Sequence, residues 1–203
     1  MVRNILRTAE ADLPVWFRRC LSNLQGRAWQ REKRLSRAIP CVAVNRLKVR
    51  RAAATDLDVL VHQRRMMFED MRHPPASQHR AADADYRRWA PRMMRRRLLR
   101  CWLVTDENGE VAGGGCVWLR DIQPGPGNTT ERIPYLLSMY TEPKFRRRGV
   151  ATMVVKEAMT WARARGYPEM TLHASRMGRK VYSRLGWRRT WEMEVDLSGD
   201  SRS

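Results

Sequence analysis

The fold of this chain is indicated most clearly by residues 140–151, which read YTEPKFRRRGVA. An apolar run ends there, Pro143 turns the chain, three arginines follow, and a helical pattern begins at Gly149. A helix start offers free N–H groups and partial positive charge, glycine lets the backbone approach a ligand, and arginines bind phosphate. The stretch therefore predicts a phosphate-binding turn between a strand and a helix. It has neither the G-K-[ST] of a P-loop nor the G-x-G-x-x-G of a dinucleotide fold.

Periodic apolar residues on both sides of this turn predict further strands and helices. The expected strands are residues 47–51, 101–105, 111–119, 133–141, 170–174 and 191–197. The expected helices run from an N-cap at Thr55 to a stop at His73-Pro74-Pro75, from Asp83 to Leu99, from Gly149 to Arg165, and from Gly178 to Leu185. Pro91 should kink or break the second of these helices.

Two glycine-containing stretches bear on how the strands pair. Asn108-Gly109 is a strong hairpin signal, so the strands on either side should be antiparallel neighbours. Gly113-Gly114-Gly115 suggests a bulge, a close backbone approach, or a weakened strand. The element order predicts an α/β fold of the α+β type, with a mixed, mainly antiparallel central sheet flanked by helices. No internal repeat is present.

The first 46 residues differ in character from the rest of the chain. They are basic, and their short apolar stretch, residues 39–44, is interrupted by Pro40. A disordered tail, a helical appendage, or upstream sequence included by an early start codon would each explain them. We favour a loosely ordered extension. The chain would then divide into an extension at 1–46, a domain at 47–197 and a tail at 198–203.

Charge is the most unusual feature of the composition. The chain has 203 residues, a formal net charge of +19 and a pI near 11.2. Such a balance favours polyanionic partners, namely nucleic acid, an anionic membrane or a phosphate-rich cofactor. An arginine-rich coding bias on a solvated surface would produce the same composition. No apolar run approaches the ~20 residues that a membrane span needs, so no membrane span is expected. We also expect no membrane partner.

Cysteine and histidine spacing argues against a metal site. The four cysteines (20, 41, 101 and 116) form no C-x-x-C pair, and the four histidines (62, 73, 79 and 173) form no H-x-x-x-H pair. The opening segment has no continuous apolar region typical of a secretory signal. Reduced thiols in a cytoplasmic protein are the simplest interpretation.

Two motifs together resemble the GNAT superfamily of acyl-CoA N-acyltransferases. Arg146, Gly149 and Ala151 fill the fixed positions of that family's [QR]-x-x-G-x-[GA] signature, and Pro143 stands where its strand–turn pattern has proline. Residues 182–187, YSRLGW, are similar to the family's Y-x-x-L-G-F ending, with tryptophan replacing phenylalanine. One helix and one strand separate the motifs, as in the family. The resemblance extends from residue 47 to residue 197.

The resemblance implies acetyl-CoA as co-substrate, without a metal, and gives individual residues roles. The strand carrying Met139, Tyr140 and Thr141 would pair with the pantetheine arm and polarise the thioester carbonyl. The N–H groups of residues 147–152 would bind the pyrophosphate, and Tyr182 would protonate the departing thiolate. Ser175 stands where many members have asparagine, and a serine reaches less far. The expected cofactor-binding residues are Met139, Tyr140, Thr141, Arg146, Arg147, Arg148, Gly149, Val150, Ala151, Thr152 and Ser175.

The implied reaction is direct attack of a primary amine on the thioester through a tetrahedral intermediate. Glu69, Asp70 and Glu142 are candidate substrate-side carboxylates, although each alone could be an ordinary surface residue. The acceptor would be a small-molecule amine or a protein N-terminus, with specificity in residues 66–79 and 121–130. The net charge disfavours polycationic acceptors such as aminoglycosides unless a local acidic patch exists.

Other functions and assemblies stay open. The charge, with Trp16, Trp29 and Trp102 as stacking candidates, suggests a basic nucleic-acid-binding module, or at least weak nonspecific association with nucleic acid. Against this, the sequence contains no nucleic-acid motif. A third hypothesis is a GNAT-like protein that binds acyl-CoA without turnover. A homodimer is also compatible with the sequence.

Overall fold

The computed structural model describes residues 46–71, 76–126 and 129–195. The expected extension, except Arg46, and the expected tail lie outside these residues, as does the His73-Pro74-Pro75 stop. The strands are β1 Lys48–Arg51, β2 Leu99–Thr105, β3 Val111–Asp121, β4 Arg132–Thr141 and β5 Thr171–Leu172. The helices are α2 Leu57–Asp70, α3 Ala76–Arg95, α4 Val150–Ala164 and α5 Arg179–Arg184, with 3-10 turns η1 Ala54–Asp56 and η2 Pro143–Phe145.

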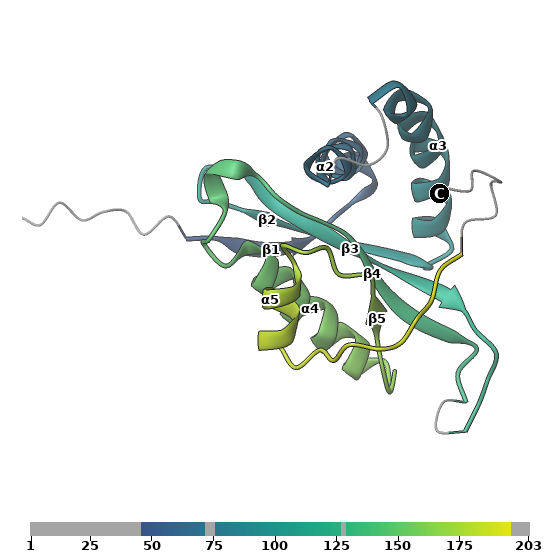
Figure 1. Ribbon diagram of the computed structural model, residues 1–203. Coiled ribbons are helices and arrows are strands. Elements are labelled where there is room, and N and C mark those ends of the chain that lie inside the picture. Colours follow the sequence, from purple (N-terminus) through teal and green to yellow (C-terminus); the bar gives the residue numbers. More distant parts are fainter. Residues whose placement is uncertain (1–45, 72–75, 127–128, 196–203) are drawn as a thin grey trace, which may run out of the picture. The chain divides into compact units, whose positions relative to one another are not determined.

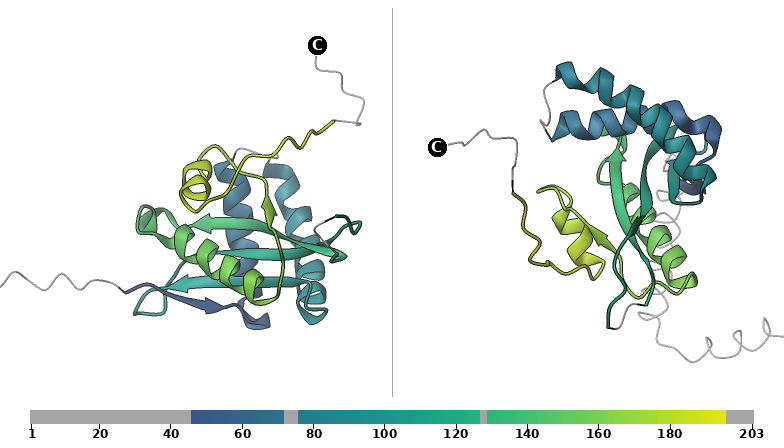
Figure 2. Two further views of the ribbon diagram at one scale, coloured as in Figure 1. Left: turned by 90° about the horizontal axis from the view of Figure 1, so that it is seen from below. Right: turned by 90° about the vertical axis from the view of Figure 1, so that its right-hand side faces the viewer.

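The five strands form one sheet in the order β1-β2-β3-β4-β5. The first four pair antiparallel and β5 pairs parallel with β4, which confirms the mixed, mainly antiparallel sheet. Helices α2 and α3 lie on one face, and α4 and α5 lie on the other (Figures 1 and 2). Strand β2 shows the consequence: Cys101 and Leu103 join the core under α2 and α3, while Trp102 and Val104 join the core under α4. A strand covered on both faces needs the continuous apolar run seen here.

The start of the first helix, α2, differs from the prediction. Thr55 is not an N-cap, because residues 54–56 form the 3-10 turn before α2. The Asp56 carboxylate accepts the Ala53 N–H at 2.7 Å and two bonds from the Arg50 guanidinium at 2.7 and 2.8 Å. These bonds fix the corner between β1 and α2, which the helical period alone does not reveal.

Helix α3 is longer at its start and shorter at its end than predicted. It begins at Ala76 instead of Asp83 and ends at Arg95 instead of Leu99, which is the first residue of β2. It also continues past Pro91. The helix persists there because Tyr86, Ala90 and Met93 are buried against the core on both sides of the proline. Packing outweighs the local cost of a proline within a helix.

The predicted final strand is wrong over its described part. Residues 191–195 pair with no strand of the described chain, and Trp191, Met193 and Val195 are largely exposed. Alternation signals a half-buried strand only if a sheet edge accepts its backbone. The neighbouring strand β5 is only two residues long, shorter than the predicted 170–174.

The glycine-rich strand β3 runs close to β4 and contains the predicted irregularity. The register shifts between Gly114 and Cys116, so Ser138 and Met139 of β4 lie opposite Gly115 alone. The extra residue is therefore in β4, not among the glycines. A Cβ on Gly115 would collide with the Met139 sulfur atom. Of the expected alternatives, the close backbone approach at these glycines is confirmed, whereas the extra residue of the bulge belongs to the partner strand.

We expect Gly113→Ala to destabilise the fold much more than Gly125→Ala. A Cβ at position 113 would lie 2.5 Å from the Tyr140 carbonyl oxygen, and backbone cannot move aside as a flexible side chain can. Overpacking of this kind costs about 1–3 kcal/mol. Gly125 has nothing within 4 Å of the same position, so it is a matched control. Urea denaturation of both variants measures the difference, and equal midpoints would contradict the close approach.

Candidate active site

The turn before α4 has the backbone geometry of an anion-binding loop. Gly149 is the N-cap of α4 with φ of 83°, and Arg147, two residues earlier, also has a positive φ of 63°. The Gly149 carbonyl accepts the first helical bond from the Met153 N–H at 3.0 Å. The N–H groups of residues 150–152 therefore point out of the helix start without an intrahelical acceptor. Left-handed residues beside a helix N-terminus form a concavity that favours phosphate.

The left-handed conformation of Arg147 is a local cost, because non-glycine residues in this region are strained by about 1–2 kcal/mol. Such strain persists only where surrounding structure holds it, and it concentrates at functional loops. By contrast, a Cβ on Gly149 would meet no atom within 4 Å. The space in front of this glycine is thus open to a ligand.

The Arg146 side chain connects the loop to strand β4 and helix α2. Its Nε donates to the Thr141 carbonyl at 3.2 Å, and its Nη2 lies 2.5 Å from the Asp70 carboxylate. The side chain expected on the cofactor therefore contacts the end of α2 and the end of β4. Arg147 and Arg148 are exposed, and the Arg148 guanidinium also lies 5.2 Å from the centre of the Phe145 ring.

Strand β4 separates from β5 just before this loop. The two strands pair only at Tyr135–Thr171 and Leu136–Leu172. Immediately after, Ser138 takes a positive φ of 52° at the bulge. The outer edge of β4 from Ser138 to Thr141 consequently has no neighbouring strand in the described chain. Apart from the Thr141 carbonyl, which accepts the Arg146 Nε–H, this edge is open to an extended ligand. Ser138 has no local sequence signal, since it is neither a glycine nor next to one.

Tyr182 and Ser175 lie together on the α4 side of the sheet. A Cβ built on Gly178 would lie 2.8 Å from the Tyr182 ring and 3.4 Å from the Ser175 hydroxyl oxygen, so this glycine lets both approach. The Ser175 hydroxyl accepts the Gly178 N–H at 3.2 Å and keeps its own proton to donate. Tyr182 and Met139 both pack against the core cluster that contains Val150. Burial raises the pKa of Tyr182 to about 12.

The three predicted carboxylates face different partners. Glu69 faces the buried His79, with 3.3 Å between Oε1 and Nδ1. Asp70 is paired with Arg146, as described above. Glu142, just beyond β4, lies 3.6 Å from Nε2 of His62, a residue that the sequence did not identify as part of the site. Burial raises the pKa of Tyr140, and the nearby Glu142 and Asp70 carboxylates add to the effect.

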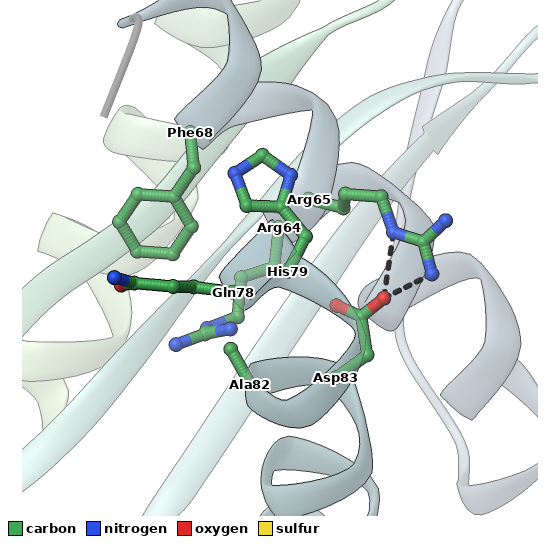
Figure 3. A pocket seen from close by; sticks show the side chains of 7 residues that line it. All are labelled: Arg64, Arg65, Phe68, Gln78, His79, Ala82 and Asp83. Atoms are coloured by element: carbon green, nitrogen blue, oxygen red, sulfur yellow. Dashed lines mark hydrogen bonds and ion pairs between the residues drawn. The ribbon is translucent and has the colours of Figure 1, made fainter. Parts of the chain in front are cut away.

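A separate pocket of about 280 Å³ lies between α2 and α3. Figure 3 shows Phe68 and Arg64 on one side and the buried His79 and Asp83 on the other. Arg65 Nε donates to Asp83 at 2.6 Å. The pocket overlaps the segment expected to set acceptor specificity, residues 66–79, at Phe68, Gln78 and His79, but it shares no residue with the predicted cofactor set. Its full lining is Arg64, Arg65, Phe68, Gln78, His79, Ala82 and Asp83.

The described residues contain neither a membrane-spanning helix nor a cluster of metal ligands. No helix in the ranges 46–71, 76–126 and 129–195 is long and apolar enough to cross a membrane. Within the same ranges, no three histidine, cysteine or carboxylate side chains are grouped as a metal site. Cys101 and Cys116 are free and buried, whereas Cys20 and Cys41 lie outside these ranges.

Comparison with known proteins assigns the family. Residues 64–187 match the model of the acetyltransferase (GNAT) family, which is more than half of the chain. The chain belongs to the GNAT acetyltransferase family. Family membership explains both the two signature motifs and the mainly antiparallel sheet. The matched region begins within α2 and ends at Trp187, the last residue of the YSRLGW motif.

Solved structures of other GNAT proteins are similar over three quarters of the chain. A predicted acetyltransferase from Clostridium acetobutylicum, solved with acetyl-CoA, is 28% identical with a TM-score of 0.67, covering 75% of this chain and 97% of that one. A GCN5-related N-acetyltransferase from Ralstonia eutropha JMP134 is 25% identical with a TM-score of 0.70, covering 76% and 100%.

Aminoglycoside N-acetyltransferase AAC(6')-Iy in complex with CoA, 19% identical with a TM-score of 0.60 and coverage of 78% and 97%, is similar in fold alone. Among curated protein sequences, none matches this chain.

Proposed function

We propose that this GNAT protein transfers the acetyl group of acetyl-CoA to a primary amine. One observation carries the proposal. Val150 at the open α4 start belongs to a core cluster, and Met139 on the unpaired edge of β4 and the half-buried Tyr182 both pack against it. We assign these three features as a pyrophosphate site, an edge for the pantetheine arm and a proton donor. The acetyl-CoA seen with the Clostridium relative supports the choice of acyl donor.

Cofactor recognition would be divided between backbone and side chains. The amides of residues 147–152 would hold the pyrophosphate, with the Arg147 and Arg148 side chains adding positive charge. The peptide groups of residues 139–141 would pair with the pantetheine arm, as an added strand pairs with a sheet edge. Arg146 would act indirectly, because its guanidinium ties the loop to Asp70 and Thr141.

The chain's own groups would assist the transfer at two points. The bound thioester supplies an activated acetyl group. The N–H groups at the β4 bulge would stabilise the negative charge that develops on its carbonyl oxygen during attack by the amine. The Tyr182 hydroxyl would donate its proton to the departing sulfur, since no hydrogen bond engages that hydroxyl within the described chain.

For the acceptor side we assign Glu142 as the group that takes the amine's proton. It is the one predicted carboxylate that faces neither an arginine nor a buried histidine, and its neighbour His62 is more than half exposed. A carboxylate–histidine pair can pass a proton to solvent. The net charge of +19 favours small amines, amino acids or protein N-termini over polycations.

The test has a binding arm and a turnover arm. Acetyl-CoA at about 100 times its Kd should stabilise the folded state by ~2.7 kcal/mol, which raises the Tm by roughly 5–10 °C for a chain of this size. Release of free CoA with a panel of amines should then identify acceptors, and Glu142→Gln should slow release by the best one.

Acetate alone is the control for the thermal shift. Absence of both a shift and a calorimetric signal with acetyl-CoA would overturn the proposal. A thermal shift without CoA release from any amine would leave an acyl-CoA binder that does not turn over. Unchanged release by Glu142→Gln would remove that residue from the proton path.

A further inference from the structure

Three arginines gather near the C-terminal end of α4. Arg100 of β2 and Arg51 of β1 are on the same face of the sheet, because Arg51 lies opposite Trp102, two residues beyond Arg100. Such diagonal neighbours are about 7–8 Å apart. Arg165 is the C-cap of α4 and follows Trp161, on which Arg100 stacks, by one helical turn. We call these three residues, which come from three different elements, the arginine cluster.

The central member, Arg100, is held against two tryptophan rings. Its guanidinium carbon lies 5.2 Å from the centre of the Trp161 ring and 5.9 Å from the centre of the Trp102 ring. The two rings meet edge to face, with 6.0 Å between their centres, and Trp102 is 2% exposed. Stacking on a buried surface restricts the guanidinium before any ligand arrives, so less side-chain freedom is lost on binding.

No carboxylate forms an ion pair with the arginine cluster within residues 46–71, 76–126 and 129–195. The neighbouring Arg50, by contrast, is ion-paired. Partial burial lowers the pKa of Arg100, and the positive charges of Arg51 and Arg165 lower it further. Glu157 partly opposes them. Because an arginine stays charged at any ordinary pH, the repulsion within the cluster persists until an anion offsets it.

We propose that Arg51, Arg100 and Arg165 bind a small ligand that carries two or more adjacent phosphate groups. A guanidinium pairs with phosphate oxygens through two parallel hydrogen bonds, so several converging arginines suit an anion of several charges. The Trp102 and Trp161 rings keep water from one side of the site, which strengthens the attraction. A compact ligand fits better than a nucleic-acid strand, because a strand needs a positive groove that follows its backbone.

The arginine cluster is separate from the loop that we assign to acetyl-CoA. Gly149 and Arg165 cap opposite ends of the 15-residue helix α4, which is about 22 Å long. A phosphate ligand at the cluster can therefore be bound at the same time as acetyl-CoA at the helix start. The inference consequently does not depend on acetyl transfer.

Calorimetric titration of the full chain with inorganic triphosphate tests the site. Arg100→Gln and Arg51→Gln should each weaken binding at least about tenfold, since each removes a charge-assisted pair. Arg51 is exposed, so its replacement leaves the tryptophan core in place even if Arg100→Gln folds poorly.

Arg120→Gln is the matched control for these variants. The Arg120 guanidinium also stacks on two rings, at 6.0 Å from the centre of Trp118 and 4.7 Å from that of Tyr135. Trp118 packs under α2 and α3, so this arginine is on the face of the sheet opposite the cluster. Arg120→Gln removes the same charge and should bind triphosphate as the wild type does.

Two further titrations define the ligand. Arg100→Lys keeps the charge but not the planar fork, so its affinity for triphosphate should lie between those of the wild type and Arg100→Gln. A single-stranded oligothymidylate of about ten nucleotides presents the same phosphate chemistry along an extended backbone. It should bind more weakly than triphosphate at equal ionic strength.

Absence of triphosphate binding would overturn the proposal. So would equal losses in Arg100→Gln and Arg120→Gln, which would indicate nonspecific attraction by the net charge. A loss in Arg147→Gln with none in Arg100→Gln would place the triphosphate at the start of α4 instead. Tighter binding of the oligonucleotide, lost in Arg100→Gln, would make nucleic acid the ligand and would equally contradict a compact phosphate site.

Discussion

Tyr182→Phe should lower turnover by at least about tenfold while acetyl-CoA affinity stays within a few-fold. The change keeps the ring, which packs on Gly178 and lies 6.0 Å from the Trp187 ring centre, and removes only the hydroxyl. CoA thiolate is a fair leaving group, so protonation helps without being indispensable. General acid catalysis of this kind contributes about 10²–10⁴-fold.

Burial of the phenol supports the proposed role. Because burial raises the pKa of Tyr182 to about 12, the hydroxyl stays protonated throughout the usual assay range. The pH profile of turnover should therefore show no alkaline fall from Tyr182 below about pH 11. The same shift contributes stability that is fully present below about pH 10, the unfolded value, and is lost as the pH rises towards 12.

Two acyl donors with different thiol acidity separate the possible roles of Tyr182. With the more acidic thiol the loss in Tyr182→Phe should shrink, because that thiolate needs less protonation. An equal loss with both donors would indicate positioning, and unchanged turnover would exclude Tyr182 from the reaction. Tyr167→Phe is the matched control, since Tyr167 packs against Trp161, away from Ser175 and Gly178.

Gly149→Val should weaken acetyl-CoA binding at least about tenfold, or about 1.4 kcal/mol. The open space in front of Gly149 is where a pyrophosphate would approach, and a branched side chain would occupy it. The positive φ of 83° adds a folding cost of about 1–2 kcal/mol that any L-residue would pay. Calorimetry for binding and urea denaturation for stability measure the two effects separately.

The opposite end of the same helix provides the control for Gly149. Gly166 has φ of 75° and also has nothing within 4 Å of a built Cβ. Gly166→Val should therefore lose similar stability but keep acetyl-CoA affinity. Equal losses of affinity in both variants would make Gly149 a structural glycine only.

Local signals in the sequence predicted most of the fold and the position of the helix start in the candidate site. The helix start at Gly149 was predictable because a proline, a basic run and a glycine determine the conformation within a few residues. The two helix ends that were misplaced, at Asp83 and Leu99, depend instead on how α3 packs. Packing also carries α3 through Pro91, which no local propensity indicates.

The partners of the site residues were not predictable. Arg146 was expected on the cofactor, but it pairs with Asp70, which is 76 residues away in sequence. The bulge at Ser138 depends on its alignment with Gly115 across the sheet, and His62 reaches Glu142 only because α2 lies over the end of β4. Each of these contacts joins segments that are distant in the sequence, so the apolar periodicity of either segment does not predict them.

The sequence by itself determined the family motifs, the order of strands and helices through α5, and the left-handed glycine that opens α4, because short-range sterics and apolar periodicity encode these features. Only the tertiary structure decided where β4 leaves β5, how deeply Tyr182 is buried, and that residues 191–195 have no strand beside them in the described chain. Strand pairing and burial depend on which other segments of the chain pack beside a strand. The same local sequence pattern can therefore form a core strand in one place and an exposed segment in another.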